Sequence, residues 1–464
     1  MQVVQVSSIG SYSDTEAIRR FARAALRLDP RTADILGRTD RERLVVVKPN
    51  WVQQAHEYKR EVWEPVITHP AVVSCVVEVL AEEMKGKGTI AICDAPNTHA
   101  DFEAIVTRGD LGNRLSHVQT KWPSLRLELL DLRREVWRVE NGVVVERRAN
   151  PPDPRGYVAV NLGRDSLLHG FRGEGRYYGA DYDVGVVNAH HHGLVQEYLL
   201  AGTPMACDLF VNLPKLKTHK KTGITCSLKN LVGINGDKNW LPHHTEGVPA
   251  TGGDEFPGAS LARRVESTLK RVGRDVALRV PHVGPWAFGR VRGAGMRVLG
   301  DSRTTIRNGD WQGNDTCWRM ALDLNRALLY GNSDGTWRDA QPRAYLTLVD
   351  GIIGGQGNGP LCPDPIESGV MLAGTNPATV DAAACRLMGF RQEDLPLVEQ
   401  AFKPHRWRIG PDDPGRTVVV RDSKGGEVLL RDLAPLPGGF RPHFGWPRLS
   451  GVGRIGHGAE ETAP

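Results

Sequence analysis

The segment from residue 212 to residue 235 holds the densest group of side chains that could do chemistry. Lys215, Lys217 and His219 alternate within it, so an extended backbone would place all three on one face. Such a face suits a carboxylate or a phosphate, because each lysine acts as a mobile point charge. A lysine held among other cations also tends towards a lowered pKa, which suits general-base or Schiff-base chemistry. Hydroxyl, amide and further ammonium groups complete the segment: Asn212, Lys220, Lys221, Thr222, Thr225, Ser227, Lys229 and Asn230. A solvated basic loop is the alternative interpretation.

Polar side chains also follow short apolar runs that are typical of strands buried on both faces. In an open parallel sheet, ligands bind beyond the carboxyl ends of the strands. We therefore expect the residues that follow these runs to share one site. They are Lys48 and Asn50 after residues 44–47, Asp94 after 89–93, Asn188 and His190 to His192 after 184–187, Asn212 after 209–211, and Asp350 after 345–349.

A glycine-rich stretch, Asp350-Gly-Ile-Ile-Gly-Gly-Gln-Gly-Asn-Gly-Pro, predicts a loop. Gly354, Gly355 and Gly357 would let backbone N–H groups approach a ligand closely, as in nests that cradle phosphate. The stretch is not a Walker A loop, because no Gly-Lys-Ser/Thr follows, and it lacks the Rossmann spacing. A simple turn is the alternative.

A metal site is a further hypothesis. The consecutive histidines His190 to His192 cannot all point one way, and His243 and His244 have the same limit. Asp94, His219 and Asp350 would form a better set of oxygen and nitrogen ligands for a divalent metal, although no spacing requires it. The chain has neither a Gly-x-Ser-x-Gly elbow nor a His-Glu-x-x-His motif, so the usual hydrolase and zinc-protease classes lose their main support.

The composition is that of an ordinary globular protein of 464 residues, with 40% hydrophobic residues and a net charge of +5. This charge permits an anionic ligand but argues against a nucleic-acid-binding protein. No apolar run approaches the roughly 20 residues that span a bilayer, and residues 1–10 do not resemble a signal peptide. The seven cysteines are scattered without a C-x-x-C pair, as expected for reduced thiols. We expect a cytoplasmic protein.

The elements that must position these side chains form an α/β fold. A helix over residues 15–26, a strand at 44–47, a helix from Pro70 to about Gly86 and a strand at 89–93 predict a βαβ unit and a mainly parallel central sheet with flanking helices. Further strands are expected at 3–6, 157–160, 184–187, 209–211, 345–349 and 370–373, a helix at 377–388, and β-hairpins around Asn141-Gly142 and Gly425-Gly426. The main domain would cover residues 1–434, in one piece or in two lobes (about 1–180 and 181–434). An Arg-rich basic insertion would occupy about 252–307, and an irregular tail 435–464.

Several motifs together resemble the bacterial and archaeal family known as domain of unknown function 362 (DUF362). They run in order from Val45 to Met388: Val-Val-Val-Lys48-Pro-Asn50, Thr68-His-Pro, Asp94-Ala-Pro, Asn212-Leu-Pro-Lys215-Leu-Lys217-Thr-His219, Thr222-Gly, Ser227-Leu-Lys229-Asn230-Leu-Val-Gly233, Asp350-Gly-Ile and Pro377-Ala-Thr-Val-Asp381-Ala. The resemblance implies an association with iron–sulfur proteins, because many members carry a ferredoxin-like cluster module. This chain lacks the C-x-x-C-x-x-C-x-x-x-C run, so the resemblance does not extend to a built-in cluster.

The leading hypothesis is an enzyme that acts on a small carboxylated or phosphorylated metabolite. His219, Lys229, Asp94 and Asp350 would be catalytic. The substrate would be held by Lys48, Asn50, Asn212, Lys215, Lys217, Thr222, Ser227, Asn230, Gly354, Gly355 and Gly357. Asp381, near the start of a helix, would complement the helix dipole, and a catalytic role is the alternative. The alternative is a redox accessory protein that binds an iron–sulfur cluster or a redox partner carrying one. A third hypothesis is a nucleic-acid or membrane-surface binder that works through the Arg-rich insertion.

Overall fold

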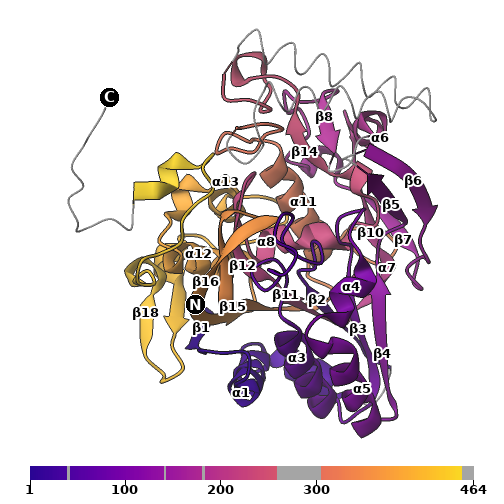
Figure 1. The fold of residues 1–464 in the computed structure, drawn as a ribbon, viewed down its shortest axis with the longest axis vertical. Helices are drawn as coiled ribbons and strands as arrows, with labels where there is room; N and C mark the ends of the chain where they lie inside the picture. The colour runs from indigo at the N-terminus through magenta and orange to yellow at the C-terminus, as the bar shows by residue number, and fades with distance from the viewer. Residues whose placement is uncertain (39–41, 141–142, 180–182, 259–304, 452–464) are drawn as a thin grey trace.

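The computed structural model describes residues 1–38, 42–140, 143–179, 183–258 and 305–451 (Figure 1). The Arg-rich insertion expected at about 252–307 lies for the most part outside these ranges, as do the last residues of the tail and the turn at Asn141-Gly142. Within the described ranges, no helix is both long and apolar enough to cross a membrane.

A large mixed sheet forms the centre of the molecule. Its main path runs through nine strands in the order β18 (Glu427–Leu429), β17 (Val418–Arg421), β1 (Gln2–Ser8), β16 (Cys362–Gly374), β15 (Ala344–Asn358), β11 (Leu209–Leu213), β2 (Leu44–Pro49), β3 (Gly88–Asp94) and β4 (Leu125–Asp131). The five strands from β15 to β4 are parallel to one another, whereas β16 runs antiparallel between β15 and β1. The mainly parallel α/β fold expected from the sequence is confirmed.

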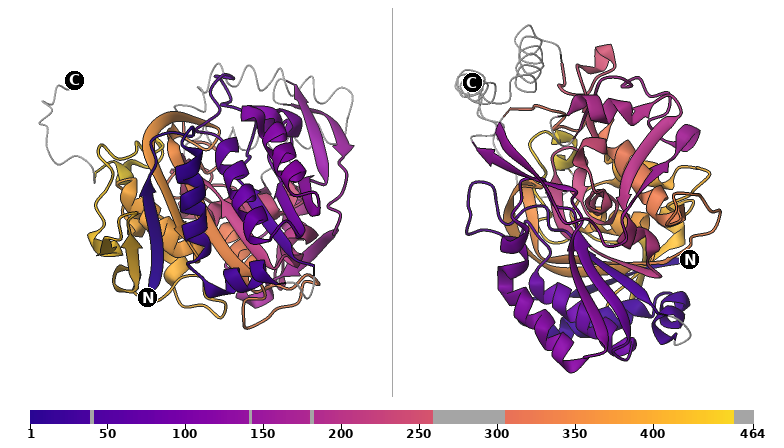
Figure 2. Two further views of the ribbon diagram at one scale, coloured as in Figure 1. Left: turned by 90° about the horizontal axis from the view of Figure 1, so that it is seen from below. Right: turned by 90° about the vertical axis from the view of Figure 1, so that its right-hand side faces the viewer.

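Helices of the first third of the chain cover one face of the sheet, as the right-hand view of Figure 2 shows. Val45 and Val47 of β2 point into this layer and Val46 points into the opposite one, because successive side chains of a strand alternate between faces. Continuous apolar strands are therefore what a sheet covered on both sides requires. The layer consists of α1 (Thr15–Leu26), α2 (Pro30–Gly37), α3 (Pro70–Glu83), α4 (Phe102–Thr107) and α5 (Leu111–Lys121).

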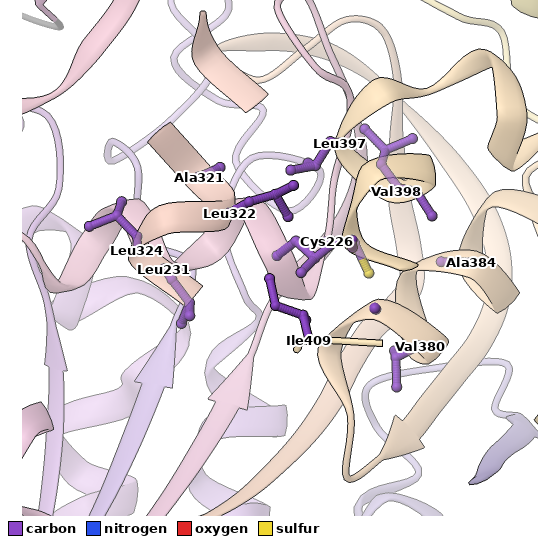
Figure 3. Packing of buried hydrophobic residues seen from close by; sticks show 14 of the residues in the cluster. Cys226, Leu231, Ala321, Leu322, Leu324, Val380, Ala384, Leu397, Val398 and Ile409 are labelled. Atoms are coloured by element: carbon purple, nitrogen blue, oxygen red, sulfur yellow. The ribbon is translucent and has the colours of Figure 1, made fainter. Parts of the chain in front are cut away.

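The opposite face is covered by α8 (Ser227–Asn230), α11 (Cys317–Tyr330), α12 (Pro377–Leu387) and α13 (Pro396–Glu399). Figure 3 shows how Cys226, Leu322, Leu397 and Val398 of this layer pack together in the core. α12 begins where expected, since Pro377 occupies its first turn and Asn376 caps it by accepting hydrogen bonds from two backbone N–H groups. α14 (Pro414–Thr417) precedes β17.

Smaller sheets extend from the central one. β5 (Glu135–Glu140) and β6 (Val143–Ala149) form the hairpin expected from the sequence. β7 (Tyr157–Asn161), β10 (Val195–Ala201) and β9 (His191–His192) form a three-stranded sheet, and β14 (Pro242–Thr245) pairs with β8 (Tyr177–Gly179). α7 (Gly202–Ala206) leads from β10 towards β11. The last described stretch is irregular apart from the 3₁₀ helix Pro447–Gly451, yet Phe440 and Trp446 are buried against the core.

The expectation of a strand at residues 184–187 is wrong. Val184–Ala189 form the short helix α6, because the side chain of Asp183 caps this segment by accepting a hydrogen bond from the backbone N–H of Val186. Only Val187 of the helix is buried, so the apolar run does not mark a strand of the central sheet. Asn188 and the three histidines after it therefore do not follow a strand of that sheet.

Candidate functional site

The basic segment forms β12 (Lys215–His219) and β13 (Gly223–Thr225), an antiparallel hairpin at the carboxyl end of the parallel strands (Figure 1). Pro214 separates β11 from β12, and its carbonyl accepts a hydrogen bond from the N–H of Asp350 at 2.9 Å. β12 then continues parallel to β15, with Lys215 opposite Asp350. Leu216 lies in the apolar core, which leaves Lys215, Lys217 and His219 on the other face of the strand, in agreement with the alternation in the sequence.

Lys48 and Asp94 form a buried ion pair between the ends of β2 and β3. The Lys48 Nζ lies 2.8 Å from the Asp94 Oδ1 and also donates to the carbonyl of Pro49 and to the amide oxygen of Asn230. The second oxygen of Asp94 accepts the backbone N–H of Trp51 at 2.7 Å. Both charges are therefore compensated within the protein.

Three asparagines connect this ion pair to β11. The Asn230 Oδ1 accepts a hydrogen bond from Asn50 at 2.8 Å, and the Asn230 Nδ2 donates to the Asn212 Oδ1 at 2.7 Å. Asn212 in turn donates to the hydroxyl of Tyr345 and to the carbonyl of Ser227. Lys48, Asn50, Asp94, Asn212 and Asn230 are thus brought together as expected, but as a network whose members mostly bond one another.

Lys215 belongs to a second buried network. Its Nζ lies 2.9 Å from the Asp350 Oδ2 and 2.7 Å from the hydroxyl of Tyr12, and this hydroxyl donates to the other oxygen of Asp350 at 2.9 Å. Burial and Asp350 raise the pKa of Tyr12 well above its ordinary value, whereas burial lowers the pKa of Lys215 against the opposing effect of Asp350. The backbone N–H groups of His69 and Ile352 also donate to the carboxylate of Asp350.

His69 is stacked between Tyr12 and Trp63, with ring centroids 3.6 Å and 5.1 Å away. Its Nδ1 accepts the N–H of Ala71 at the start of α3, so its proton must be on Nε2, which lies 3.7 Å from Glu64. Burial lowers the pKa of His69 to about 4. This imidazole is therefore neutral at pH 7.

Lys217 is fully buried, and no carboxylate of the described residues pairs with it. Its Nζ donates to the carbonyl of Val66. Burial, together with the charges of Lys215 and Lys229, lowers the pKa of Lys217 well below its ordinary value, although Asp94 acts in the opposite direction. Lys217 therefore interacts with charges of both networks, Asp94 and Lys215, and also with Lys229.

Lys229 on α8 has neither a hydrogen bond nor an ion pair within the described part of the chain, and it is only 7% exposed. Burial lowers the pKa of its ammonium group, Cys317 acts in the opposite direction, and Lys221 lowers the pKa further. Two lysines on the hairpin have a counterion instead, since the carboxylate of Asp310 lies 3.0 Å from both Lys220 and Lys221.

His219 and His243 carry their protons on opposite ring nitrogens. The His219 Nδ1 accepts backbone N–H groups of Lys221 and Thr222 at 3.0 and 3.3 Å, so the proton is on Nε2. The His243 Nδ1 lies 2.8 Å from the carbonyl of Leu241 and must donate to it, so its Nε2 has a free lone pair. Burial and the charge of Lys229 hold the pKa of both rings well below 6.5. We call Lys217, His219, Lys221, Lys229 and His243 the basic cluster.

Asp381 holds α8 in place. From the neighbouring helix α12, its carboxylate accepts the backbone N–H groups of Ser227 at 2.7 Å and Leu228 at 3.1 Å. Burial raises the pKa of Asp381 to about 6 despite these bonds. Asp381 thus caps the start of α8, the helix that carries Lys229, rather than the start of its own helix.

The glycines after Asp350 lie in a strand, not in the expected loop. Gly354, Gly355 and Gly357 belong to β15, which pairs with β16 over this stretch. A Cβ on Gly355 would come within 2.8 Å of the Cβ of Lys217 and of the carbonyl of Pro65. These glycines allow the β15–β16 hairpin to pack closely against β12. Their regular strand pairing is not the conformation of a phosphate-binding nest.

The structure places the remaining expected residues in three separate groups. Asp94 pairs with Lys48, Asp350 with Lys215, and His219 lies among lysines, so the three residues expected to hold a metal do not meet. Among the described residues, no three His, Cys, Asp or Glu side chains are arranged to hold a metal ion. All seven cysteines are free thiols. Thr222 donates to the carbonyl of Ile224, and the hydroxyl of Ser227, at the start of α8, lies 3.9 Å from the sulfur of Cys226.

Several members of these groups were not expected from the sequence. Tyr12 and His69 lie far from Asp350 along the chain, and Asp310 follows the Arg-rich segment. His243 was considered only as a metal ligand, because a pair of adjacent histidines gives no orientation. Only the motif Thr68-His69-Pro70 indicated a specific place for His69, because a proline in the first turn of a helix makes the preceding residue the N-cap.

Comparisons with known proteins identify the family and leave the activity open. The model of the family described as "Domain of unknown function (DUF362)" matches residues 135–386, slightly more than half of the chain. A search of curated proteins finds no match. A crystal structure of a Thermotoga maritima protein from the Northeast Structural Genomics Consortium is similar at a TM-score of 0.33 with 12% sequence identity, over 83% of this chain and 59% of that chain. The chain thus spans about three fifths of that protein's length, and a similarity this weak adds nothing about function.

The region matched by the family model contains β12, α8 and Asp350, and it also contains Asp381. The basic cluster therefore lies within the part of the molecule that defines the family, and the chain belongs to the DUF362 family.

Proposed function

We propose that the protein is an enzyme that binds a small anionic metabolite, carboxylated or phosphorylated, at the basic cluster. The observation that carries this proposal is Lys229, a lysine that is nine-tenths buried and has no partner in the described part of the chain. Isolated buried charges are costly, so such groups are normally paired or neutral. An anion bound here would supply the missing counterion.

The charge balance around Lys229 supports an anion. Lys217, Lys221, His219 and His243 all interact electrostatically with it, and Asp310 is the carboxylate paired with Lys221. The lysines of the two neighbouring networks are already satisfied by Asp94 and Asp350. Lys217 and Lys229 of the basic cluster are therefore the lysines of this region that lack a carboxylate among the described residues, and a bound anion would supply one.

The two imidazoles support acid–base chemistry on the bound anion. The Nε2–H of His219 is a proton donor, and the Nε2 of His243 is a proton acceptor. Both rings are neutral at pH 7, because their pKa values lie well below 6.5. One site thus holds an acid and a base in complementary forms.

Thermal unfolding with phosphate, sulfate and acetate tests the binding site. We expect phosphate or acetate to raise the melting temperature of the wild-type protein and to have a much smaller effect on a Lys229→Met variant. Lys403→Met is the matched control, because this lysine lies on the surface with a 55% exposed side chain. Equal shifts in the wild type and in Lys229→Met would contradict the proposal.

Proton uptake gives a second, independent readout. An anion beside Lys229 raises the pKa of the ammonium group, so binding near pH 8 should take up protons from the solution. Calorimetric titration in buffers with different ionisation enthalpies measures this uptake. Anion binding without proton uptake would mean that Lys229 is not the group that meets the anion.

A spectrum and an elemental analysis of protein purified without oxygen test the redox alternative. The proposal expects a colourless protein. Stoichiometric iron with a charge-transfer band that dithionite bleaches would instead favour a redox accessory protein.

A further inference from the structure

Lys229 differs from the lysines around it because it is not fully buried and has no partner among the described residues. Lys48, Lys215 and Lys221 each have a carboxylate within 3.0 Å. Lys217 is fully buried and donates to the carbonyl of Val66. Lys229 alone among these five keeps a small exposed area and forms no hydrogen bond in the described structure.

The surroundings of Lys229 favour a neutral amine. Burial and the neighbouring Lys221 lower the pKa of its amine against the opposing effect of Cys317, and α8 has no acidic side chain. Burial lowers the pKa of Lys229, so a larger fraction of this amine is uncharged and nucleophilic than for an exposed lysine. An amine of this kind attacks carbonyl carbons.

We propose that Lys229 forms an imine with the carbonyl carbon of a small oxo acid, a compound that carries a ketone or aldehyde group next to its carboxylate. This inference rests on the proposed anion site, since the cations around Lys229 would hold the carboxylate. It names the substrate class of that site and gives Lys229 a covalent role.

The step is balanced with groups that the site contains. The lone pair of Nζ forms the C–N bond, and the C=O π electrons move to the oxygen, which takes a proton from the Nε2–H of His219. The nitrogen loses a proton to the Nε2 of His243. His243 then gives its proton to the hydroxyl, which leaves as water while the nitrogen lone pair forms the C=N bond. The remaining N–H proton passes to the Nε2 of His219. Both histidines are restored, so amine and carbonyl give imine and water without an oxidant or a reductant. The complementary tautomers of the two histidines are what this sequence of transfers needs.

Borohydride trapping tests the proposal on the full-length protein. The protein is incubated with pyruvate, glyoxylate or 2-oxoglutarate, reduced with sodium borohydride, digested and analysed by mass spectrometry. We expect a reduced adduct on the peptide that contains Lys229, clearly more abundant than at the surface residue Lys403, since a lowered pKa raises the fraction of neutral, nucleophilic amine. An adduct mainly on another lysine, or none with any of the three acids, overturns the inference.

A Lys229→Arg variant separates the charge from the amine. Arginine keeps the cation but cannot form an imine, so the variant should lose the adduct and still be stabilised by lactate, which has no carbonyl next to its carboxylate. Lys403→Arg is the matched control and should keep the adduct. Binding of lactate and pyruvate to the wild type without trapping would overturn the imine and leave the anion site standing. If neither acid, nor phosphate, raises the melting temperature of the wild type, both proposals fail.

Discussion

Lys215 and Lys217 lie two residues apart on β12 and have opposite electrostatic surroundings. Replacing Lys215 by Met leaves the carboxylate of Asp350 buried without its cation, a change expected to lower the free energy of unfolding by about 3–5 kcal/mol. Replacing Lys217 by Met removes a buried ammonium group that has no carboxylate partner, so the free energy of unfolding should stay the same or rise by about 1 kcal/mol. Chemical denaturation of both variants at neutral pH measures the two changes.

The same pair of variants connects stability to function. If Lys217 is kept for an anion, Lys217→Met is stable and loses stabilisation by phosphate or acetate. Two variants that are equally unstable would show that Lys217 contributes to folding in the way Lys215 does, and would argue against a ligand role for it.

His219 and His243 should make the protein less stable in acid. Their pKa values in the folded protein lie well below 6.5, so the unfolded chain binds more protons below that pH. The free energy of unfolding is then independent of these two groups above about pH 6.5 and falls as the pH falls below it. The free energy of unfolding, measured by denaturation between pH 4.5 and 7.5, should therefore depend less on pH for His219→Gln and His243→Gln than for the wild type. His117→Gln, on the exposed side of α5, is the control and should leave the curve unchanged.

At the scale of elements, the four-residue helix α8 depends on a carboxylate from another helix. The pKa of Asp381 is raised from 3.8 to about 6 by burial, so the folded protein binds more protons than the unfolded chain between these values. Ionisation of Asp381 therefore lowers the free energy of unfolding as the pH rises through this window, by on the order of 3 kcal/mol in total. This dependence has the opposite sign to that of the two histidines.

Asp381→Asn isolates the effect of this cap. The variant keeps an oxygen that can accept one backbone N–H of α8 but loses the ionisation, so the difference in unfolding free energy between wild type and variant should fall from pH 4 to pH 7. It should also weaken anion binding at Lys229, because α8 loses one of the two hydrogen bonds that fix it. The exposed Asp412→Asn serves as control. A pH-independent difference would mean that the carboxyl of Asp381 ionises normally.

Elements with a local signal could be predicted from the sequence, and long-range pairings could not. Helix 15–26 and the strand at 44–47 were predicted because their apolar spacing reflects burial on one or both faces. The prediction of a strand at 184–187 was wrong, because the helix cap at Asp183 had more effect than the strand preference of three valines. In the site, the alternation of Lys215, Lys217 and His219 predicted their common face. The Tyr12–Asp350 bond, 338 residues apart in sequence, depends on how β15 is aligned in the sheet.

At the scale of the whole molecule, the central sheet joins both halves of the chain. β1 lies between β16 and β17, and β11 lies between β2 and β15, so strands from before and after residue 180 are interleaved. Each side of the sheet has its own apolar core, and the two cores share the same strands. Neither core can be lost without exposing one face of this sheet.

We therefore expect the cores to unfold together. Leu328→Ala on α11 and Leu80→Ala on α3 lie on opposite faces, are fully buried, and should each lower the free energy of unfolding by about 2–5 kcal/mol. Hydrogen exchange should show that the amides of β2 and β15 lose protection at the same denaturant concentration in the wild type. In each variant the two strands should again lose protection together, at a lower concentration. If the sequence-based division into lobes at about residue 180 were also a division of stability, Leu80→Ala would release β2 and leave β15 protected. That result would show that the shared sheet does not couple the two halves.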